Sequence, residues 1–148
     1  AKSRFNKINL AAAAAFAIIL TLVAVFAWRA ARVKAGDAKR VRDVQYIQQA
    51  LQLYFNDNLE YPEVSGTGQR ARPDAAACGQ EGTQFACFLP DYPTYPKARR
   101  DGPCENYAGY AYSKLPISEG GYRITFCLDV GAEGLAAGLH EATAKGMR

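Results

Sequence analysis

The stretch that decides the fold is LAAAAAFAIILTLVAVFAW, residues 10–28, and the chain continues from it without a proline as far as Tyr61-Pro62. The stretch contains no charged residue, and Thr21 is its only polar one. At 1.5 Å per residue its nineteen residues form a helix about 28 Å long, enough to cross the hydrocarbon core of a bilayer. The sequence therefore predicts a membrane-length helix that passes directly into a soluble one.

Basic residues flank the apolar run on both sides, so the positive-inside rule gives no orientation. They are Lys2, Arg4, Lys7, Arg29, Arg32 and Lys34. A secretory signal peptide has a similar charged start and apolar core, and it is the first alternative. We expect the segment to be retained instead, because the residues after Trp28 remain helix-forming and offer no cleavage site. The first residue is Ala1 and not methionine, which indicates that a leader has been removed.

Beyond the apolar run, apolar side chains recur every three or four residues, the period of a helix that buries one broad face. The side chains expected to pack against the rest of the protein are Val44, Ile47, Leu51, Tyr54 and Phe55, continued by Asn58 and widened by Tyr46, Ala50 and Leu53. The solvated side is expected to carry Lys39, Arg40 and Arg42.

The expected helix begins near Phe5 or Asn6 and ends within residues 56–58, where an asparagine can adopt the left-handed cap conformation before the Pro62 turn. Its fifty or so residues would span about 75 Å. Gly36 is the weak point, costing about 1 kcal/mol relative to alanine, and any bend is expected there.

Residues 59–148 hold all four cysteines, all seven prolines and twelve of the thirteen glycines. So short and loop-rich a segment cannot bury a large core alone, and should use the apolar face of the helix and disulfides. The predicted fold is α+β: a long N-terminal helix packed on a small antiparallel sheet with disulfide-stapled loops. We expect residues 1–36 to form the membrane or filament-core half of the helix. Residues 37–148 form the head, with the amphipathic helix half over 37–58 and the β domain over 59–148.

The clearest strand covers residues 122–130, where five apolar side chains alternate with polar ones. Cys127 should point away from the apolar face of this strand. A shorter alternation over residues 107–113 places Tyr110 and Tyr112 on one side. The segment between them, residues 114–121, can join the two strands as an antiparallel hairpin.

Four cysteines without a CxxC pair, beside a single histidine, indicate disulfides in an oxidising compartment and not a zinc site. Three pairings of four cysteines are possible. The favoured one joins Cys104 to Cys127, because residues near the start of one hairpin strand lie opposite the end of the other. It leaves Cys78 to pair with Cys87.

Residues 35–62, AGDAKRVRDVQYIQQALQLYFNDNLEYP, resemble the family of type IV pilins and type II secretion pseudopilins. In that family a charged block on a long N-terminal helix precedes an exit similar to QxxLxxYxxxxxxYP, and Gln48, Leu51, Tyr54 and Tyr61-Pro62 match it. The order of features after residue 62 is also similar to that of pilin-like proteins. It runs from a loop with Leu89-Pro90 through the strand GYRITFCLDV to the tail GLAAGLHEATAKG. The resemblance covers nearly the whole chain, and its specific part is the helix.

The chain departs from the family at its start. Family members usually begin with phenylalanine and carry a glutamate at the fifth position, which is thought to pair with the N-terminal amine of a neighbouring subunit. The fifth residue here is Phe5. If Phe5 takes the family's first position, Asn9 stands where the glutamate would be, so neither register supplies a carboxylate.

The resemblance implies a structural subunit of a helical filament, a type IV pilus that supports attachment, motility or DNA uptake. It implies a helical homopolymer as the main partner, the membrane before assembly, and a prepilin peptidase with a pilus assembly machinery. The localisation implied is the cytoplasmic membrane for the precursor and then the extracellular filament. The residues expected in the filament core are Phe5, Asn9, Phe16, Ile18, Ile19, Leu20, Leu22, Val23, Val25 and Phe26.

Two alternatives explain the apolar run and the disulfides as well. One is a single-pass anchor that presents an extracytoplasmic binding domain and never polymerises, and the other is a secretion pseudopilin. The absent glutamate favours the anchor, whereas the uninterrupted helix favours the filament, because a flexible linker would serve an anchored domain better.

An enzyme is the least supported interpretation, since His140 is the only histidine and no nucleophile stands beside a base. The sequence predicts no catalytic residue, no cofactor and no metal site, because it has no dense run of Asp and Asn ligands. Nucleic-acid binding is physically possible, because the chain has nine tyrosines and the loop cations Arg70, Arg72, Lys97, Arg99 and Arg100. Structural tyrosines and solvated loop charges are the simpler interpretation.

Overall fold

The computed structural model describes residues 2–74, 76–79 and 82–148, with the side chains of residues 2–9 left out of the description. The chain forms two compact units, which divide between Val33 and Lys34. The first unit holds the apolar part of helix α1, and the second, called the head below, holds the rest of α1 and all the strands. Phe5 and Asn9 belong to α1, but their side chains lie outside the description.

Helix α1 (Lys2–Asn58) has 57 residues and passes through Gly36 without interruption. It begins before the predicted start near Phe5, because residues 2–5 contain no proline or glycine that would prevent a helical turn. At its end Leu59, and not an asparagine, adopts the left-handed conformation, with a φ of 59°, and its N–H bonds to the carbonyl of Phe55. The predicted end of the helix is confirmed, but the residue predicted to cap it is wrong.

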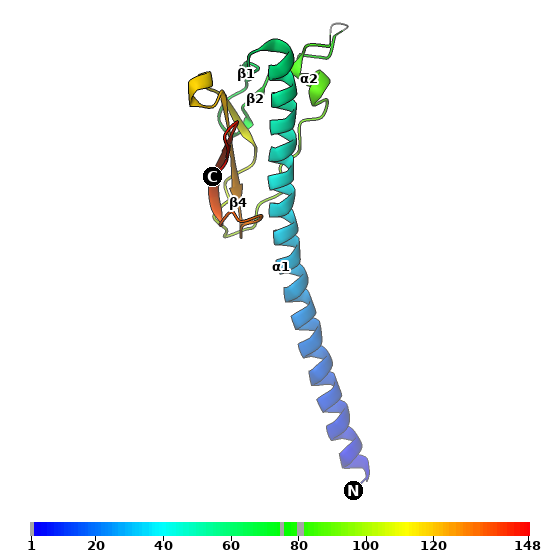
Figure 1. Cartoon of the computed structure of the whole chain (residues 1–148). Helices are drawn as coiled ribbons and strands as arrows, with labels where there is room; N and C mark the ends of the chain where they lie inside the picture. The colour runs from blue at the N-terminus through cyan, green and yellow to red at the C-terminus, as the bar shows by residue number, and fades with distance from the viewer. Residues whose placement is uncertain (1, 75, 80–81) are drawn as a thin grey trace. The chain divides into compact units, whose positions relative to one another are not determined.

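The head contains a four-stranded antiparallel sheet in the order β3-β4-β5-β6. Its strands are β3 (Ala111–Lys114), β4 (Tyr122–Leu128), β5 (Gly138–Thr143) and β6 (Gly146–Met147). Figure 1 labels strand β4, which lies beside α1. A two-stranded ribbon pairs β1 (Val64–Ser65) with β2 (Arg72–Pro73). Three short helices complete the described part of the head: η1 (Gly68–Arg70), α2 (Phe85–Phe88) and η2 (Ile117–Glu119). The predicted α+β fold, a long helix packed on a small antiparallel sheet, is confirmed.

The predicted hairpin exists, but its strands are shorter than the alternation indicated. β3 pairs with β4 so that Tyr112 faces Ile124, whereas residues 107–110 are not part of a strand. The N–H groups of Tyr107 and Ala108 bond instead to the carbonyl of Cys104 and the side chain of Gln69. The segment after Leu135, interpreted from sequence only as a tail, forms β5 and β6.

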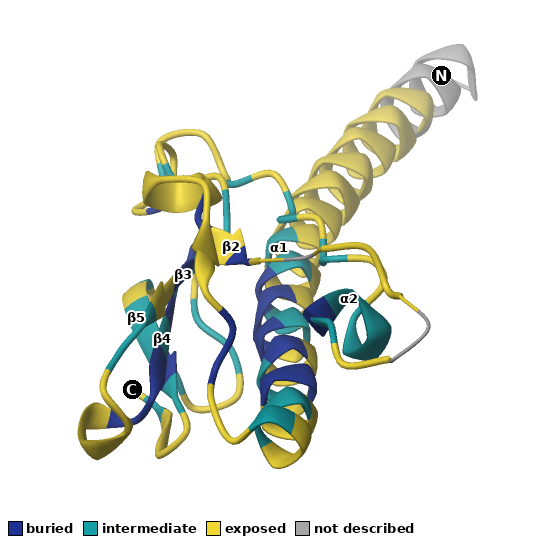
Figure 2. Cartoon of the chain, turned by 90° about the horizontal axis from the view of Figure 1, so that it is seen from above, coloured by how far each residue is buried: buried dark blue, intermediate teal, exposed yellow. Residues whose placement is uncertain are grey.

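The core lies between the head part of α1 and the sheet, where buried residues follow one stripe of the helix (Figure 2). Val44, Ile47 and Leu51 are fully buried, as predicted, and Tyr54 and Phe55 are partly buried against them. Val41, not predicted, and Ala50 also lie in this core.

Two side chains expected to widen the stripe do not belong to it, because Tyr46 and Leu53 are exposed. At about 100° per residue, both fall roughly 140–160° from the fully buried Leu51 around the helix axis. A helix contacts a single sheet over a narrower arc than that, so these two positions remain on its outer side.

An aromatic cluster closes the core at the end of α1. The ring of Tyr61 stacks on Phe55, with centroids 4.8 Å apart, and meets Tyr122 edge-on at 5.0 Å. Gly121, at a φ of +74°, allows this contact, because a Cβ there would lie 2.0 Å from Cε2 of Tyr61. The backbone at Gly121 thus forms one wall of the cluster.

We expect Gly121→Ala to destabilise the head by about 2–4 kcal/mol, since it combines an unfavourable positive φ with overpacking against Tyr61. Gly134→Ala is the matched control: its φ of +85° is similar, but no atom lies within 4 Å of the added Cβ. The control should lose only about 1–2 kcal/mol. Denaturant unfolding of the full chain in detergent, followed by the near-ultraviolet circular dichroism of the tyrosines, measures both. Equal losses would show that the contact with Tyr61 has no energetic weight.

Two disulfides join Cys78 to Cys87 and Cys104 to Cys127, which are the pairs that the hairpin argument favoured. Cys127 lies off the apolar face of β4 as expected, but it is buried, because Cys104 and its loop cover it. This bridge therefore attaches the long loop before β3 to the central strand of the core.

Replacing both cysteines of the Cys104–Cys127 bridge by alanine is expected to cost about 2–5 kcal/mol. The same change at Cys78–Cys87 should cost less, because this bridge closes a loop of 9 residues and the Cys104–Cys127 bridge closes one of 23. The shorter loop alone lowers the entropic stabilisation by about 0.8 kcal/mol. Cys78 is also exposed, so its removal leaves no buried void. Unfolding midpoints of the two double variants test this order, and the reverse order would contradict it.

Candidate functional site

The first candidate site is the apolar surface of α1 in the first unit. Every described residue from Leu10 to Arg32 is exposed, including all eight described side chains predicted for a filament core, from Phe26 at 69% to Val25 at 41%. They are Phe16, Ile18, Ile19, Leu20, Leu22, Val23, Val25 and Phe26. By length and composition this helix can cross a membrane, and the described residues bury none of its most apolar window. So large an apolar surface requires lipid or protein around it.

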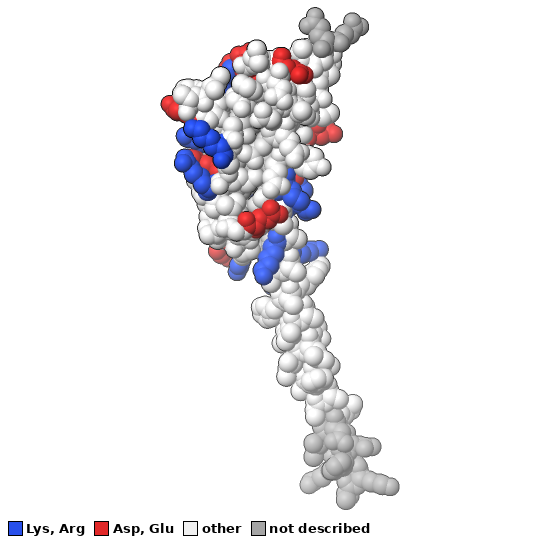
Figure 3. All heavy atoms as spheres, in the orientation of Figure 1, with Lys and Arg blue, Asp and Glu red and all other residues white. Residues whose placement is uncertain are grey.

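The boundary of this surface is marked by charge. The guanidinium of Arg32 lies 3.9 Å from the centroid of the Trp28 ring, a cation–π contact at the end of the apolar run. In Figure 3 the described atoms of residues 10–28 carry no acidic or basic side chain, whereas both signs of charge are mixed over the head. Tryptophan beside a basic residue is typical of the interface between a bilayer and water.

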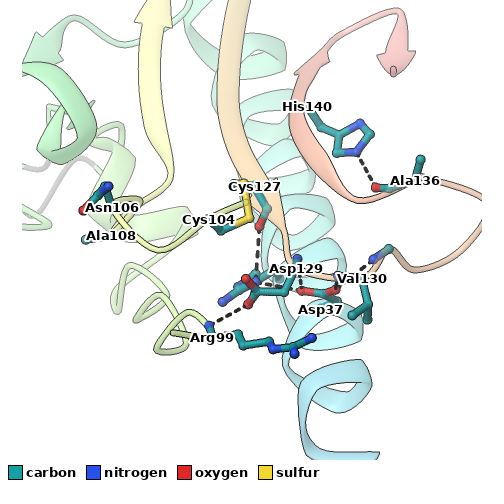
Figure 4. The surroundings of a disulfide bond; sticks show 12 residues. Asp37, Arg99, Cys104, Asn106, Ala108, Cys127, Asp129, Val130, Ala136 and His140 are labelled. Atoms are coloured by element: carbon teal, nitrogen blue, oxygen red, sulfur yellow. Dashed lines mark hydrogen bonds and ion pairs between the residues drawn. A yellow bond between two sulfur atoms is a disulfide. The ribbon is translucent and has the colours of Figure 1, made fainter. Parts of the chain in front are cut away.

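The second candidate site is a buried charge cluster in the head, formed by Asp37 and Arg40 of α1 and Asp129 after β4. Figure 4 shows two of its members, Asp37 and Asp129, in the surroundings of the Cys104–Cys127 disulfide. Nη1 of Arg40 lies 2.7 Å from Oδ1 of Asp37 and 2.9 Å from Oδ2 of Asp129. Arg40 is 1% exposed, so its predicted place on the solvated side of the helix is wrong. Two carboxylates compensate its charge, which is what allows it to be buried.

Asp37 determines where β4 ends. Its carboxylate accepts hydrogen bonds from three successive backbone N–H groups, those of Asp129 at 2.9 Å, Val130 at 2.7 Å and Gly131 at 3.0 Å. These groups are therefore unavailable to a neighbouring strand. This is why β4 stops at Leu128, although the predicted strand ran to Val130.

Arg40 connects two further parts of the head to α1. Its Nη2 donates to the carbonyl of Pro96 at 3.2 Å, and its guanidinium lies 4.7 Å from the centroid of the Tyr95 ring. Tyr95 in turn donates through its hydroxyl to the carbonyl of Cys127 at 2.7 Å. The carboxylate of Asp129 also accepts a hydrogen bond from the backbone N–H of Arg99 at 3.0 Å. The cluster thus joins α1, the loop of residues 95–99 and the end of β4.

Sequence reasoning missed this cluster, although one signal for it was present. Arg40 stands four residues before Val44 and seven before Ile47, so it continues the buried stripe of the helix. Asp37 stands one turn earlier and can reach the same side chain. The third member, Asp129, follows the last residue of β4 and carries no comparable pattern.

A second polar contact lies next to the cluster. The hydroxyl of Tyr110 donates to Asp43 at 2.6 Å, and Asp43 also pairs with Lys39 at 2.5 Å. Burial, with the hydrogen bond and charge of Asp43, raises the pKa of Tyr110 far above its ordinary value. Burial also raises the pKa of Tyr95 to about 12, against an opposing effect of Arg40. Both phenols therefore remain neutral hydrogen-bond donors at physiological pH.

The tyrosines that prompted the nucleic-acid hypothesis mainly pack against one another. The ring of Tyr95 lies 5.9 Å from that of Tyr107 and 4.9 Å from that of Tyr110, and Tyr112 is fully buried. Part of their ring surface is therefore occupied within the head.

His140 is part of β5, where Nε2 lies 2.8 Å from the carbonyl of Ala136. Its ring lies 5.7 Å from that of Phe126 on the paired strand. Among the described residues no group of three or more His, Cys, Asp or Glu side chains is arranged to hold a metal ion.

Comparison of the chain with models of protein families, with curated proteins and with solved structures gave no match. The architecture itself is pilin-like: a long N-terminal apolar helix followed by a small antiparallel sheet with disulfides. The apolar helix and the disulfides together indicate a membrane-associated, extracytoplasmic protein.

Proposed function

We propose that this chain is the structural subunit of an extracellular helical filament of the type IV pilus kind. The observation that carries the proposal is the uncovered apolar surface of residues 10–28, which belongs to the same helix, α1, that the head packs against. No enzymatic activity is part of this proposal.

The apolar segment can exchange one nonaqueous environment for another. In the membrane, the helix satisfies its own backbone hydrogen bonds and its side chains contact lipid. After extraction, the same segments of neighbouring subunits replace the lipid. The five alanines of residues 11–15 permit close approach of helix backbones, and larger side chains such as Phe16 and Ile19 fill the space between them. A repeated head-to-tail contact that does not close produces a fibre.

The buried charge cluster supports this function from within the head. Asp37 and Arg40 lie in the first turns of α1 that belong to the head, and they bond to the end of β4 and to the loop of residues 95–99. A load applied to this part of the helix therefore reaches the sheet through buried hydrogen bonds as well as apolar contacts. A subunit of a fibre under tension benefits from such a connection.

The proposal includes the partners and places that the resemblance implied. Before assembly the chain lies in the cytoplasmic membrane, where a prepilin peptidase and an assembly machinery process it, and the finished homopolymer is extracellular. Attachment, motility and DNA uptake are the activities proposed for such a filament. A secretion pseudopilin would use the same apolar segment for a shorter fibre.

One observation favours a second candidate, a membrane-anchored domain that does not polymerise. Neither Phe5 nor Asn9 supplies the carboxylate that pairs with a neighbouring N-terminus in the resembled family. An anchor needs no such pairing.

Imaging of sheared surface material from cells that produce the chain separates the two candidates. The filament predicts thin fibres with a regular axial repeat, whose helical reconstruction places residues 10–28 in a packed core and keeps them helical. The anchor predicts that the chain remains in the membrane fraction and that no fibre contains it. Fibres with a non-helical stretch within residues 10–28 would contradict the predicted continuous core helix.

A further inference from the structure

A small cavity lies in the head between the end of η1, strand β2 and the loops of residues 92–95 and 108–110. Its volume is about 170 Å³, and its polar lining side chains are Gln69, Arg70, Arg72 and Thr94, beside tyrosine rings. This space is large enough for several water molecules. It is thus the size of one polar group or sugar ring and smaller than an ordinary cofactor pocket.

The cavity concentrates positive charge without a counter-charge. Arg70 and Arg72 both line it, and within the described part of the chain neither forms an ion pair. Among the described residues that line it there is no aspartate or glutamate. Burial raises the pKa of Tyr92 well above its ordinary value, so this wall stays neutral at physiological pH. Arg70 and Arg72 are both exposed to solvent, and two arginines that line one space are a typical receptor for a carboxylate or phosphate.

Hydrogen bonds hold the walls of the cavity in place. The side chain of Gln69 donates to the carbonyl of Asn106 at 3.1 Å and accepts from the N–H of Ala108 at 2.7 Å. A Cβ on Gly109 would lie 2.1 Å from the carbonyl oxygen of Gln69, so these two backbones are in direct contact. The wall formed by η1 is thereby fixed to the loop before β3.

The wall formed by β2 is fixed to the core in the same way. The N–H of Tyr112 in β3 bonds to the carbonyl of Ala71 at 2.9 Å, next to Arg72. The guanidinium of Arg72 lies 5.1 Å from the centroid of the Tyr92 ring, and the Tyr92 hydroxyl donates to the carbonyl of Tyr110 at 3.1 Å. The cavity is therefore formed before any ligand arrives, which lowers the entropic cost of binding.

We propose that this cavity binds a sugar-sized molecule that carries one carboxylate or phosphate group. Arg70 and Arg72 pair with the anionic group, and Thr94 and the backbone of the loops contact its hydroxyl groups. All lining residues belong to the head, so the site does not depend on polymerisation.

The test is a titration of the full chain in detergent micelles, followed by the amide chemical shifts of Ala108 and Gly109 at low salt. The probes are glucuronate, glucose 6-phosphate and uncharged glucose. We expect at least one acidic sugar to give saturable shifts and to bind about tenfold or more tightly than glucose. The binding constant should weaken as salt is added. A preference for glucuronate identifies a carboxylate ligand, and one for glucose 6-phosphate identifies a phosphate ligand.

Variants assign the binding to the two arginines. Arg70→Gln/Arg72→Gln should weaken binding about tenfold or more, whereas Arg72→Lys, which keeps the charge, should lose less. Arg100→Gln is the control, because Arg100 is exposed and does not line the cavity. Unchanged amide shifts elsewhere in the head show that each variant is folded. Equal binding of glucose, absence of saturable shifts with both acidic sugars, or an equal loss in the Arg100 variant would overturn the proposal.

Discussion

Ile19→Asp is expected to reduce the yield of filaments at least a hundredfold. Ile19 lies at the middle of the apolar run, and its side chain is exposed in the single chain. In a packed filament core, each subunit would bury one unpaired carboxylate, at a cost of about 3 kcal/mol or more. Every 1.4 kcal/mol changes an association constant about tenfold, so this cost exceeds two orders of magnitude.

The control is Ile19→Leu, which preserves volume and polarity and should leave the yield within about twofold. Filament yield is measured by shearing and electron microscopy, and is divided by the amount of chain in the membrane fraction, because a central aspartate also weakens membrane insertion by about 2.5–3.5 kcal/mol. A normal yield of fibres from the aspartate variant would show that residues 10–28 are not their core.

Arg40→Ala is expected to destabilise the head by about 3–5 kcal/mol. The substitution leaves two buried carboxylates, Asp37 and Asp129, close together without a cation. It also removes the hydrogen bond to the carbonyl of Pro96 and the contact with the Tyr95 ring. Since domains of this size have a total stability of about 5–15 kcal/mol, the variant loses a large fraction of it.

Arg42→Ala is the matched control, because Arg42 lies on the same helix but is exposed. Its stability should change by less than about 0.5 kcal/mol. The double variant Arg40→Met/Asp129→Asn should recover part of the loss, since it removes one carboxylate together with the cation and leaves a neutral amide near Asp37. Near-ultraviolet circular dichroism during denaturant unfolding measures all three. Equal stability of the Arg40 and Arg42 variants would show that the cluster contributes nothing.

The features that were predicted correctly are those that a short stretch of sequence decides. An uninterrupted run of helix-forming residues was enough to predict α1. The three-to-four residue period of its apolar side chains was enough to predict the burial of Val44, Ile47 and Leu51. The alternation of residues 122–128 was enough for β4, and the turn before it for the hairpin with β3. Once the hairpin was predicted, it brought Cys104 near Cys127.

The features that were missed depend on residues far apart in the chain. Arg40 and Asp129 are 89 positions apart, and Arg40 looked like a surface residue because a lone arginine is normally solvated. Strand β5 was missed because three of its six residues, Gly138, Glu141 and Ala142, are of types depleted in strands, and it forms only because β4 supplies hydrogen-bond partners from Ile124 to Leu128.

The amino-acid sequence by itself determined that the chain has a membrane-length apolar helix, a head that shares this helix, and two disulfides, because periodicity and cysteine spacing act locally. Only the tertiary structure decided which polar residues are buried and where β4 ends. A charged side chain can be buried when its partners compensate the loss of its hydration. Those partners, Asp129 for Arg40 and three backbone N–H groups for Asp37, come from a segment of the chain far from α1 in sequence.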